Sequence, residues 1–373
     1  MIGNFDSLKN LLKRREKPTL ERWVNKLHYR ATTSLLLGSC ILVTTIEWVG
    51  NDSRISCIME GPDDSWTIPA NVINTYCYIM TTFTLPKHYN SRVGHDSLAP
   101  GVGSYNWDTG DETYRAYYQW VPFVLFFQAI LFYIPHSLFK IWEGGKVTSI
   151  MIGLNNLVLD KDDRETRQKL LANYLVESVN THNLWAWKML LVDFLNVVNL
   201  IFNIYFVDVF LGGEFSAYGT RVIEFLEADP EKRIDPMSVV FPRVTKCTFF
   251  KYGPSGSMQR HDSLCVLPIN IVNEKIYVFL WFWFLALSIV TILGMFYHLV
   301  VTRSSGITKA LILYRSMNKE SNKLDSIGEN YQIGDWKLLF IISQNMEPIV
   351  FCELIKNLHM AFLLKKRENI LEK

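Results

Sequence analysis

The sequence lacks the residue patterns that mark the common enzyme classes, and it has almost no excess charge of either sign. It contains no His-Glu-x-x-His pair, no Gly-x-Ser-x-Gly turn and no phosphate loop ending in Gly-Lys-Ser/Thr. Its eight histidines are scattered, without a pair at metal-ligand spacing. A formal net charge of +2 does not indicate a nucleic-acid surface. We therefore expect a protein that is not an enzyme, has no catalytic residues, uses no metal or cofactor and binds no nucleic acid.

Apolar and aromatic residues, by contrast, are abundant. Apolar residues make up 49% of the chain and aromatics 14%, with 23 Phe, 17 Tyr and 11 Trp. Aromatic rings of this number suit the interior of a lipid bilayer and its two interfaces. Charged residues still reach 20%, so substantial parts of the chain must lie in water. The composition predicts a membrane protein with sizeable domains outside the bilayer.

Four apolar runs are long enough to cross a bilayer, which takes about 20 residues in a helix. The predicted transmembrane helices are residues 28–50, 117–136, 184–211 and 276–301. The second and fourth are apolar on every side, whereas a surface helix of a soluble protein is apolar on one stripe. Tryptophans lie near the ends of the runs, as in an aromatic belt. The predicted fold class is a mainly α, polytopic membrane protein.

The distribution of charge predicts which side of the membrane each segment faces. The first thirty residues hold eight basic and three acidic residues, whereas the loop after the first helix holds four basic and eight acidic ones. Because basic residues favour the cytoplasmic side, both termini are predicted to be cytoplasmic. The predicted cytoplasmic segments are 1–27, 137–183 and 302–373, and the predicted extracellular loops are 51–116 and 212–275. Both outer loops are long enough to form an ordered structure.

The cysteines agree with this topology. Two lie in each predicted outer loop, where an oxidising compartment permits disulfides. They are Cys57 and Cys77 in the first loop, and Cys247 and Cys265 in the second. Four cysteines allow three pairings, and the spacing does not choose among them. Cys40 in the first helix and Cys352 in the tail are expected to be unpaired thiols.

The first predicted transmembrane helix has an unusual polar load, which suits a pore. Its small and polar residues are Thr33, Ser34, Gly38, Thr44, Thr45 and Glu47. Glu47 lies near the outer end, where a ring of carboxylates would attract cations. Equally, Glu47 could sit at the interface without any such role. Thr33, Ser34, Gly38, Thr45 and Glu47 are the pore-lining candidates of this helix.

The N-terminal segment has apolar residues at helical spacing, at Phe5, Leu8 and Leu11–Leu12. One face could pack against a pore wall while Asn4 and Lys9 face the lumen. Alternatively, the segment lies on the inner leaflet with its basic residues on anionic lipid. The residues leave both placements open.

Three asparagines in the third predicted transmembrane helix share a face, at Asn196, Asn199 and Asn203. Amides inside a bilayer are costly unless they are partnered. They either bond to neighbouring helices or face water, and we favour the first interpretation.

Further landmarks resemble the innexin family. Tyr117-Tyr118-Gln119-Trp120 opens the second predicted helix like the innexin signature, after Pro100-Gly101-Val102-Gly103 and before Trp142-Glu143-Gly144-Gly145-Lys146. The second outer loop adds Phe241-Pro242-Arg243 and Gly253-Pro254-Ser255-Gly256, and the fourth helix follows Asn273-Glu274-Lys275. The landmarks run in family order from residue 20 to about residue 345.

The resemblance implies a gap-junction subunit at the plasma membrane. Innexins assemble around a pore, as octamers in the best-known case, and two hemichannels dock through their outer loops so that ions and small metabolites pass between cells. The resemblance implies disulfides Cys57–Cys265 and Cys77–Cys247, a pore funnel from the N-terminal segment and a helical cytoplasmic dome. It also places Trp66 at the outer constriction, by analogy with an aromatic residue of pannexins. The implied partners are further copies of the chain, the opposing hemichannel, other innexins and membrane lipids.

Two rival classes share part of this pattern. A four-span adhesion protein of tetraspanin or claudin type has disulfide-bonded outer loops but passes no current; the polar first helix counts against it. A pannexin-like hemichannel that never docks is harder to exclude, because docking depends on the surface of the loops. Connexins carry three cysteines in each outer loop, and this chain has two.

Overall fold

The computed structural model describes residues 21–49, 54–58, 68–104, 110–151, 161–228, 235–316 and 321–371. The chain divides into two compact units, which we treat separately. The strand-containing unit comprises Leu27–Tyr133 and Val197–Ile289. The helical unit comprises Met1–Lys26, Ile134–Asn196 and Val290–Lys373.

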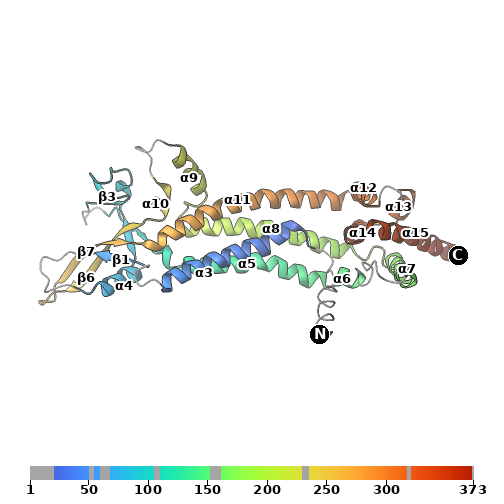
Figure 1. Ribbon diagram of the computed structural model, residues 1–373, viewed down its shortest axis with the longest axis horizontal. Coiled ribbons are helices and arrows are strands. Elements are labelled where there is room, and N and C mark those ends of the chain that lie inside the picture. Colours follow the sequence, from blue (N-terminus) through green and yellow to red (C-terminus); the bar gives the residue numbers. More distant parts are fainter. Residues whose placement is uncertain are drawn as a thin grey trace, which may run out of the picture. The chain divides into compact units, whose positions relative to one another are not determined.

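In the described part of the chain, four helices are long and apolar enough to cross a membrane (Figure 1). They are Trp23–Val49, α5 (Val121–Glu143), α8 (Asn183–Phe210) and α11 (Pro268–Arg303). The first of them consists of α2 (Trp23–Lys26), the π-helical η1 (Leu27–Thr32) and α3 (Thr33–Val49). α5 continues through Pro135, and α11 begins at Pro268, a residue favoured at the first helical position. The first turns of α11 bury Asn270, Asn273 and Glu274, so this end of the helix is part of the folded strand-containing unit.

The strand-containing unit is built on a five-stranded antiparallel sheet of order β1-β7-β6-β2-β5. The strands are β1 (Ser56–Ile58), β2 (Thr82–Thr84), β5 (Thr113–Arg115), β6 (Val244–Tyr252) and β7 (Met258–Val266). A second small sheet pairs β3 (Ser97–Ala99) with β4 (Val102–Gly103). β6 and β7 form a long hairpin, and both predicted outer loops contribute strands to the main sheet.

Short helices complete this unit. They are α4 (Ala70–Met80), η3 (Pro86–His88), η4 (Tyr117–Gln119), α9 (Tyr218–Glu227) and α10 (Pro236–Val240). An aromatic cluster forms the centre of the core: Phe241, which is fully buried, stacks on Tyr277 at a centroid distance of 5.3 Å and meets Tyr117 edge-on at 5.4 Å. Aromatic pairs of this geometry add to the stabilisation from apolar burial. The cluster ties α11, α10 and η4 into one body.

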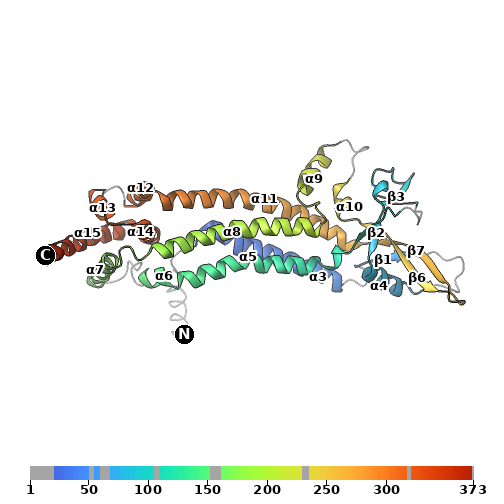
Figure 2. The same ribbon diagram turned by 180° about the vertical axis from the view of Figure 1, so that it is seen from behind.

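The helical unit contains α6 (Lys146–Met151), α7 (Lys161–Glu177), α12 (Ser305–Arg315), α13 (Ser321–Gly328), α14 (Ile333–Asn345) and α15 (Pro348–Leu371) (Figure 2). Its core is a separate apolar cluster that includes Leu338, Leu339, Phe351 and Leu354. Asp335 caps α14 in a capping box with Gln332 and also accepts a hydrogen bond from the backbone of Asn180 at 2.9 Å. The segment before α8 and the C-terminal helices thereby fold together.

Candidate pore-lining helix and disulfide-bonded domain

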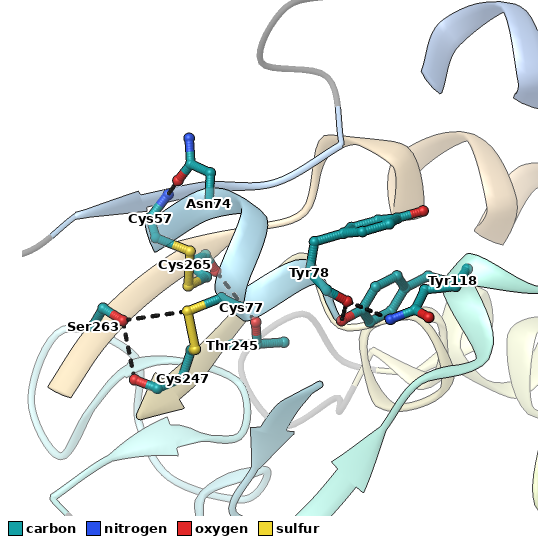
Figure 3. Close-up of a disulfide and its surroundings, with 10 residues drawn as sticks. Cys57, Asn74, Cys77, Tyr78, Tyr118, Thr245, Cys247, Ser263 and Cys265 are labelled. Atoms are coloured by element: carbon teal, nitrogen blue, oxygen red, sulfur yellow. Dashed lines mark hydrogen bonds between the residues drawn. A yellow bond between two sulfur atoms is a disulfide. The ribbon is translucent and has the colours of Figure 1, made fainter. Parts of the chain in front are cut away.

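Two disulfides join the two predicted outer loops (Figure 3). Cys57 on β1 bonds Cys265, its direct neighbour on β7, across 208 residues of sequence. Cys77 on α4 bonds Cys247 on β6 across 170 residues. These are the pairs that the family resemblance implies. All four cysteines are buried, and because each sulfur is in a disulfide, none is available as a thiolate for a metal ion.

The signature Tyr117-Tyr118-Gln119-Trp120 joins helices α4 and α10 to the start of α5. The Tyr117 hydroxyl donates to the carbonyl of Val240 at 2.8 Å, and burial raises the pKa of this phenol. The hydroxyl of Tyr118 and the amide of Gln119 both donate to the carbonyl of Tyr78 at the end of α4 (Figure 3). Trp120 is 58% exposed and makes a ring contact with Phe123 instead. The motif is thus a joint between the outer loops and a transmembrane helix.

Arg243 and Glu274 form a second joint that the sequence reasoning did not foresee. The Arg243 guanidinium donates to both carboxylate oxygens of Glu274, at 2.9 Å from Nη2 to Oε1 and 3.0 Å from Nε to Oε2. The Glu274 side chain is only 1% exposed. Both residues belong to landmark motifs, but their 31-residue separation gives no local signal that they pair.

One face of the first long helix is exposed and mixes small and polar residues with large apolar ones, and Leu42 and Val49 beside it are exposed too. The positions recur every three or four residues, which is the helical repeat. They are Arg30, Ser34, Gly38, Ile41, Thr45 and Trp48. We call this set the exposed stripe. The buried positions lie on the other side of the helix and include Leu36 and Val43, both completely buried.

The predicted pore-lining residues divide between these two faces. Ser34, Gly38 and Thr45 lie on the exposed stripe, and the Thr45 hydroxyl donates to the carbonyl of Ile41 at 2.7 Å. Thr33 is partly buried beside the stripe. Glu47 is on the packed face, 9% exposed, and no described residue bonds its Oε1. The physical reason is helical rotation: two residues beyond Thr45, a side chain points to the far side.

The other long helices expose a different chemistry. Apart from Lys275 and Ala286 of α11, their exposed residues in the strand-containing unit are large and apolar, as lipid contact requires. They include Phe123, Phe126 and Ile130 of α5, Ile201 and Tyr205 of α8, and Phe279, Leu285 and Ile289 of α11. Among the described parts of these four helices, only the first has serine, glycine and threonine at exposed positions.

The asparagines of α8 are partnered in two ways. The Asn196 amide donates to Asn25 Oδ1 at 3.2 Å, which is a bond between helices. Asn203 instead donates to the carbonyl of Asn199, one turn earlier in the same helix, at 2.8 Å. The interpretation as contacts between helices therefore describes Asn196. The Asn203 amide donates within its own helix, and its buried Oδ1 has no hydrogen-bond partner among the described residues.

A charge cluster in the helical unit anchors the residues that follow the N-terminal segment. Arg22 lies 3.3 Å from Asp193 and donates to the carbonyl of Gly294 at 2.6 Å, and His298 bonds the same carboxylate. The buried Lys337 on α14 donates to the carbonyl of Ala186 at 3.2 Å, and burial lowers its pKa to about 7. A cavity of about 100 Å³ lies between these groups. The residues that connect to the N-terminal segment are thus fixed to α8 and α11.

Three of the predicted site residues, Asn4, Lys9 and Trp66, lie outside the described residues, so their placement stays a prediction.

Four apolar helices and a disulfide-bonded, strand-containing unit together define a four-span membrane protein, as far as the described residues show. The innexin family model matches residues 21–362. Innexin inx2 of Drosophila melanogaster is 44% identical over 358 residues, covering 96% of this chain and 95% of the relative. Innexin inx2 of Schistocerca americana is also 44% identical, covering 96% of this chain and 97% of the relative. The chain belongs to the innexin family, and it is therefore a gap-junction channel subunit and not an enzyme.

Within the family the sequence also resembles innexin three, which is one of several members that match. Innexin inx3 of Drosophila melanogaster is 41% identical over 359 residues, covering 96% of this chain and 88% of the relative. Innexins form oligomeric channels, so the neighbours of this chain in the membrane include further subunits.

Proposed function

We propose that copies of this chain form a ring, octameric by family resemblance, in which the exposed stripe of the first long helix lines the pore. The observation that carries the proposal is the contrast between exposed faces. The stripe holds Ser34, Gly38 and Thr45 beside the apolar Ile41 and Trp48, and its small and hydroxyl-bearing positions are poorly matched to acyl chains. The phenylalanines and isoleucines on α5, α8 and α11 are well matched to them. If the stripe faces a water-filled lumen, its hydroxyl groups meet water while the apolar faces of α5, α8 and α11 meet lipid.

The pore in this proposal is lined mainly by neutral groups. Ser34, Gly38 and Thr45 offer hydroxyls and backbone, which suits a wide and weakly selective path. Arg30, at the start of the stripe, supplies a ring of positive charge. Glu47 lies on the packed side of the helix, so it is replaced in this account by Arg30 as the main charged group of the described stripe.

Disulfides in one unit and basic residues before the first long helix support one orientation of the chain in the membrane. The two buried disulfides support an oxidising, extracellular compartment for the strand-containing unit. The basic excess before the first long helix favours a cytoplasmic N-terminus, and four crossings return the C-terminus to the same side. The helical unit then lies in the cytoplasm. The N-terminal segment, with Asn4 and Lys9, would either enter the pore or lie on the inner leaflet.

Docking to an opposing hemichannel is assigned to the β6–β7 hairpin. Near the base of the hairpin, Leu264–Val266 of β7 pair with β1, and Lys246 of β6 pairs with β2. From Thr248 to Tyr252 and from Met258 to Asp262, the described strands pair only with each other. This outer half exposes Tyr252 by 73% and Met258 by 61%. A two-stranded ribbon with exposed apolar residues is marginal alone and gains stability from a partner surface.

Electrical recording from paired cells tests the proposal. The unaltered chain is expected to give junctional conductance between cells. The double variant Tyr252→Ser/Met258→Ser should lose junctional conductance while keeping surface expression and current across the single membrane. The matched control, Tyr114→Ser, removes a 61% exposed tyrosine from β5 and should keep both currents. Junctional conductance that survives in the double variant would exclude the hairpin as the docking element, and current across single membranes alone would point to an undocked hemichannel.

A further inference from the structure

Helix α9 lies beside the outer ends of two transmembrane helices. α8 ends at Phe210, and the turn after it is fixed by Asp208, whose carbonyl accepts from Gly213 N at 2.7 Å and whose carboxylate accepts from Ser216 N at 2.7 Å. α9 begins at Tyr218, two residues after Ser216. Figures 1 and 2 both show α9 running crosswise to α8 and α11.

The start of α9 packs directly on α11 through Gly219. A Cβ at this position would lie 2.0 Å from Cε3 of the Trp281 ring, so only glycine permits this approach. The Trp281 indole also donates to the carbonyl of Ser216 at 3.2 Å. Tyr218 is fully buried against Phe241. These contacts fix α9 against the side of α11.

The depth of this contact corresponds to the membrane interface. Lys275, whose side chain is 62% exposed, carries a charge on α11 that favours water over acyl chains. Trp281 is six residues further along the helix, which is about 9 Å at 1.5 Å per residue. Tryptophan is enriched at the boundary between headgroups and acyl chains. α9 therefore meets α11 at that boundary.

The face of α9 that touches Trp281 continues as exposed apolar surface. Ile223 and Leu226 follow Gly219 by four and seven residues, so they lie on the same side of the helix, one and two turns further along. They are 42% and 70% exposed. Arg221, which pairs with Glu214, and the exposed Glu224 lie on other sides. Near Trp281 in the sequence, α11 also exposes apolar side chains, including Phe282 and Leu285.

We propose that α9 is an interfacial helix that inserts Ile223 and Leu226 between the acyl chains of the outer leaflet. Helices with one apolar and one charged face bind the headgroup boundary in this way. The charged residues of α9 are mostly acidic, so the fitting lipid is zwitterionic, such as phosphatidylcholine, and not anionic. The assignment to the outer leaflet rests on the proposed orientation, whereas insertion into lipid does not. The helix would hold the strand-containing unit at a fixed height on the bilayer.

Spin labelling of the full chain tests this inference. Leu226→Cys, and separately Ile223→Cys, would be made with Cys40→Ser and Cys352→Ser, labelled with a nitroxide and reconstituted in phosphatidylcholine nanodiscs. The matched control is Glu224→Cys on the charged side of α9. Relaxation by oxygen, which concentrates in lipid, is compared with relaxation by a water-soluble nickel chelate.

Labels at Leu226 and Ile223 should respond more to oxygen than to nickel, and the label at Glu224 should respond more to nickel. A response to nickel at all three positions would place the apolar face in water and overturn the inference. Labels at Leu226 and Ile223 that respond to neither reagent would overturn it as well, because they would show that a neighbouring subunit covers the face. Each variant is first checked to have the same oligomeric size as the unaltered protein. If only one of the Leu226 and Ile223 variants passes this check, that variant alone still tests the inference. Neither outcome depends on junctional conductance, so the docking proposal is tested separately.

Discussion

Removing Arg243 should destabilise the strand-containing unit more than removing its partner Glu274. The two residues share a bidentate ion pair with bonds of 2.9 and 3.0 Å. Their environments differ, because the Glu274 side chain is 1% exposed and that of Arg243 is 40% exposed. A charge left alone in a buried site is far more costly than one that reaches water.

The magnitudes follow from that asymmetry. Breaking a fully buried pair by removing one partner costs about 3–5 kcal/mol. Arg243→Met leaves the Glu274 carboxylate with Lys275 at 3.1 Å, a largely exposed partner, so we expect a loss of about 2–3 kcal/mol. Glu274→Gln keeps the side-chain volume and leaves Arg243 in contact with water and Asp235, at 3.4 Å, so about 1 kcal/mol is expected. The double variant should lose less than the sum, because the two single changes remove one shared interaction.

The assay is the thermal unfolding midpoint of the purified oligomer in detergent, measured for the unaltered chain, both single variants and the double variant. The expected order of midpoints is unaltered, then Glu274→Gln, then Arg243→Met. Equal midpoints for the two single variants, or strictly additive shifts in the double variant, would refute the reasoning from burial.

Three further predictions concern other parts of the chain. Burial lowers the pKa of Lys337 from 10.5 to about 7, so between these pH values the unfolded chain holds more protons than the folded one. The free energy of unfolding therefore rises with pH, by up to about 1.4 kcal/mol per pH unit. Lys337→Met should remove this rise in the unfolding midpoint between pH 7 and 9, and an equal dependence on pH in the variant and the unaltered chain would contradict the assignment. Tyr117→Phe keeps the ring but removes the donor to Val240 at 2.8 Å, so a loss of about 1–3 kcal/mol is expected, and an unchanged unfolding midpoint would show that the bond is unimportant. Arg30→Glu reverses the charge of the exposed stripe, so the reversal potential in asymmetric salt should shift toward cation preference, and no shift would place Arg30 off the conduction path.

The long-range architecture could be predicted where one strong signal decides it. Four apolar runs of the required length can only be satisfied in lipid, so the transmembrane helices follow from composition alone. The beginning of α11 could not be predicted in this way, because its first turns carry Asn270, Asn273 and Glu274. Their polarity is typical of a loop when their partners in the fold are unknown. The strands β1, β2 and β5 have three residues each, too few for an alternating pattern to stand out.

The candidate pore face was only half predictable, although the signal was present in the sequence. Counting polar residues along the first helix selects Thr33 and Glu47 as readily as Ser34 and Thr45. The helical repeat separates them, because Ser34, Gly38 and Thr45 share one side while Glu47 points away from it. Pairs such as Arg22 and Asp193, separated by 171 residues, depend on how the helices pack and have no local pattern.

Cysteine accessibility along the first long helix is the most direct test of the claim that its exposed stripe lines the pore. In a background with Cys40→Ser and Cys352→Ser, single variants Ser34→Cys and Thr45→Cys would be compared with Leu36→Cys and Val43→Cys at completely buried positions. A charged, water-soluble thiol reagent is applied while conductance is recorded. The account predicts that the two stripe variants are modified and lose conductance, whereas the two buried variants are unaffected. Conductance that is unchanged at Ser34 and Thr45, or blocked equally at Leu36 and Val43, would contradict it.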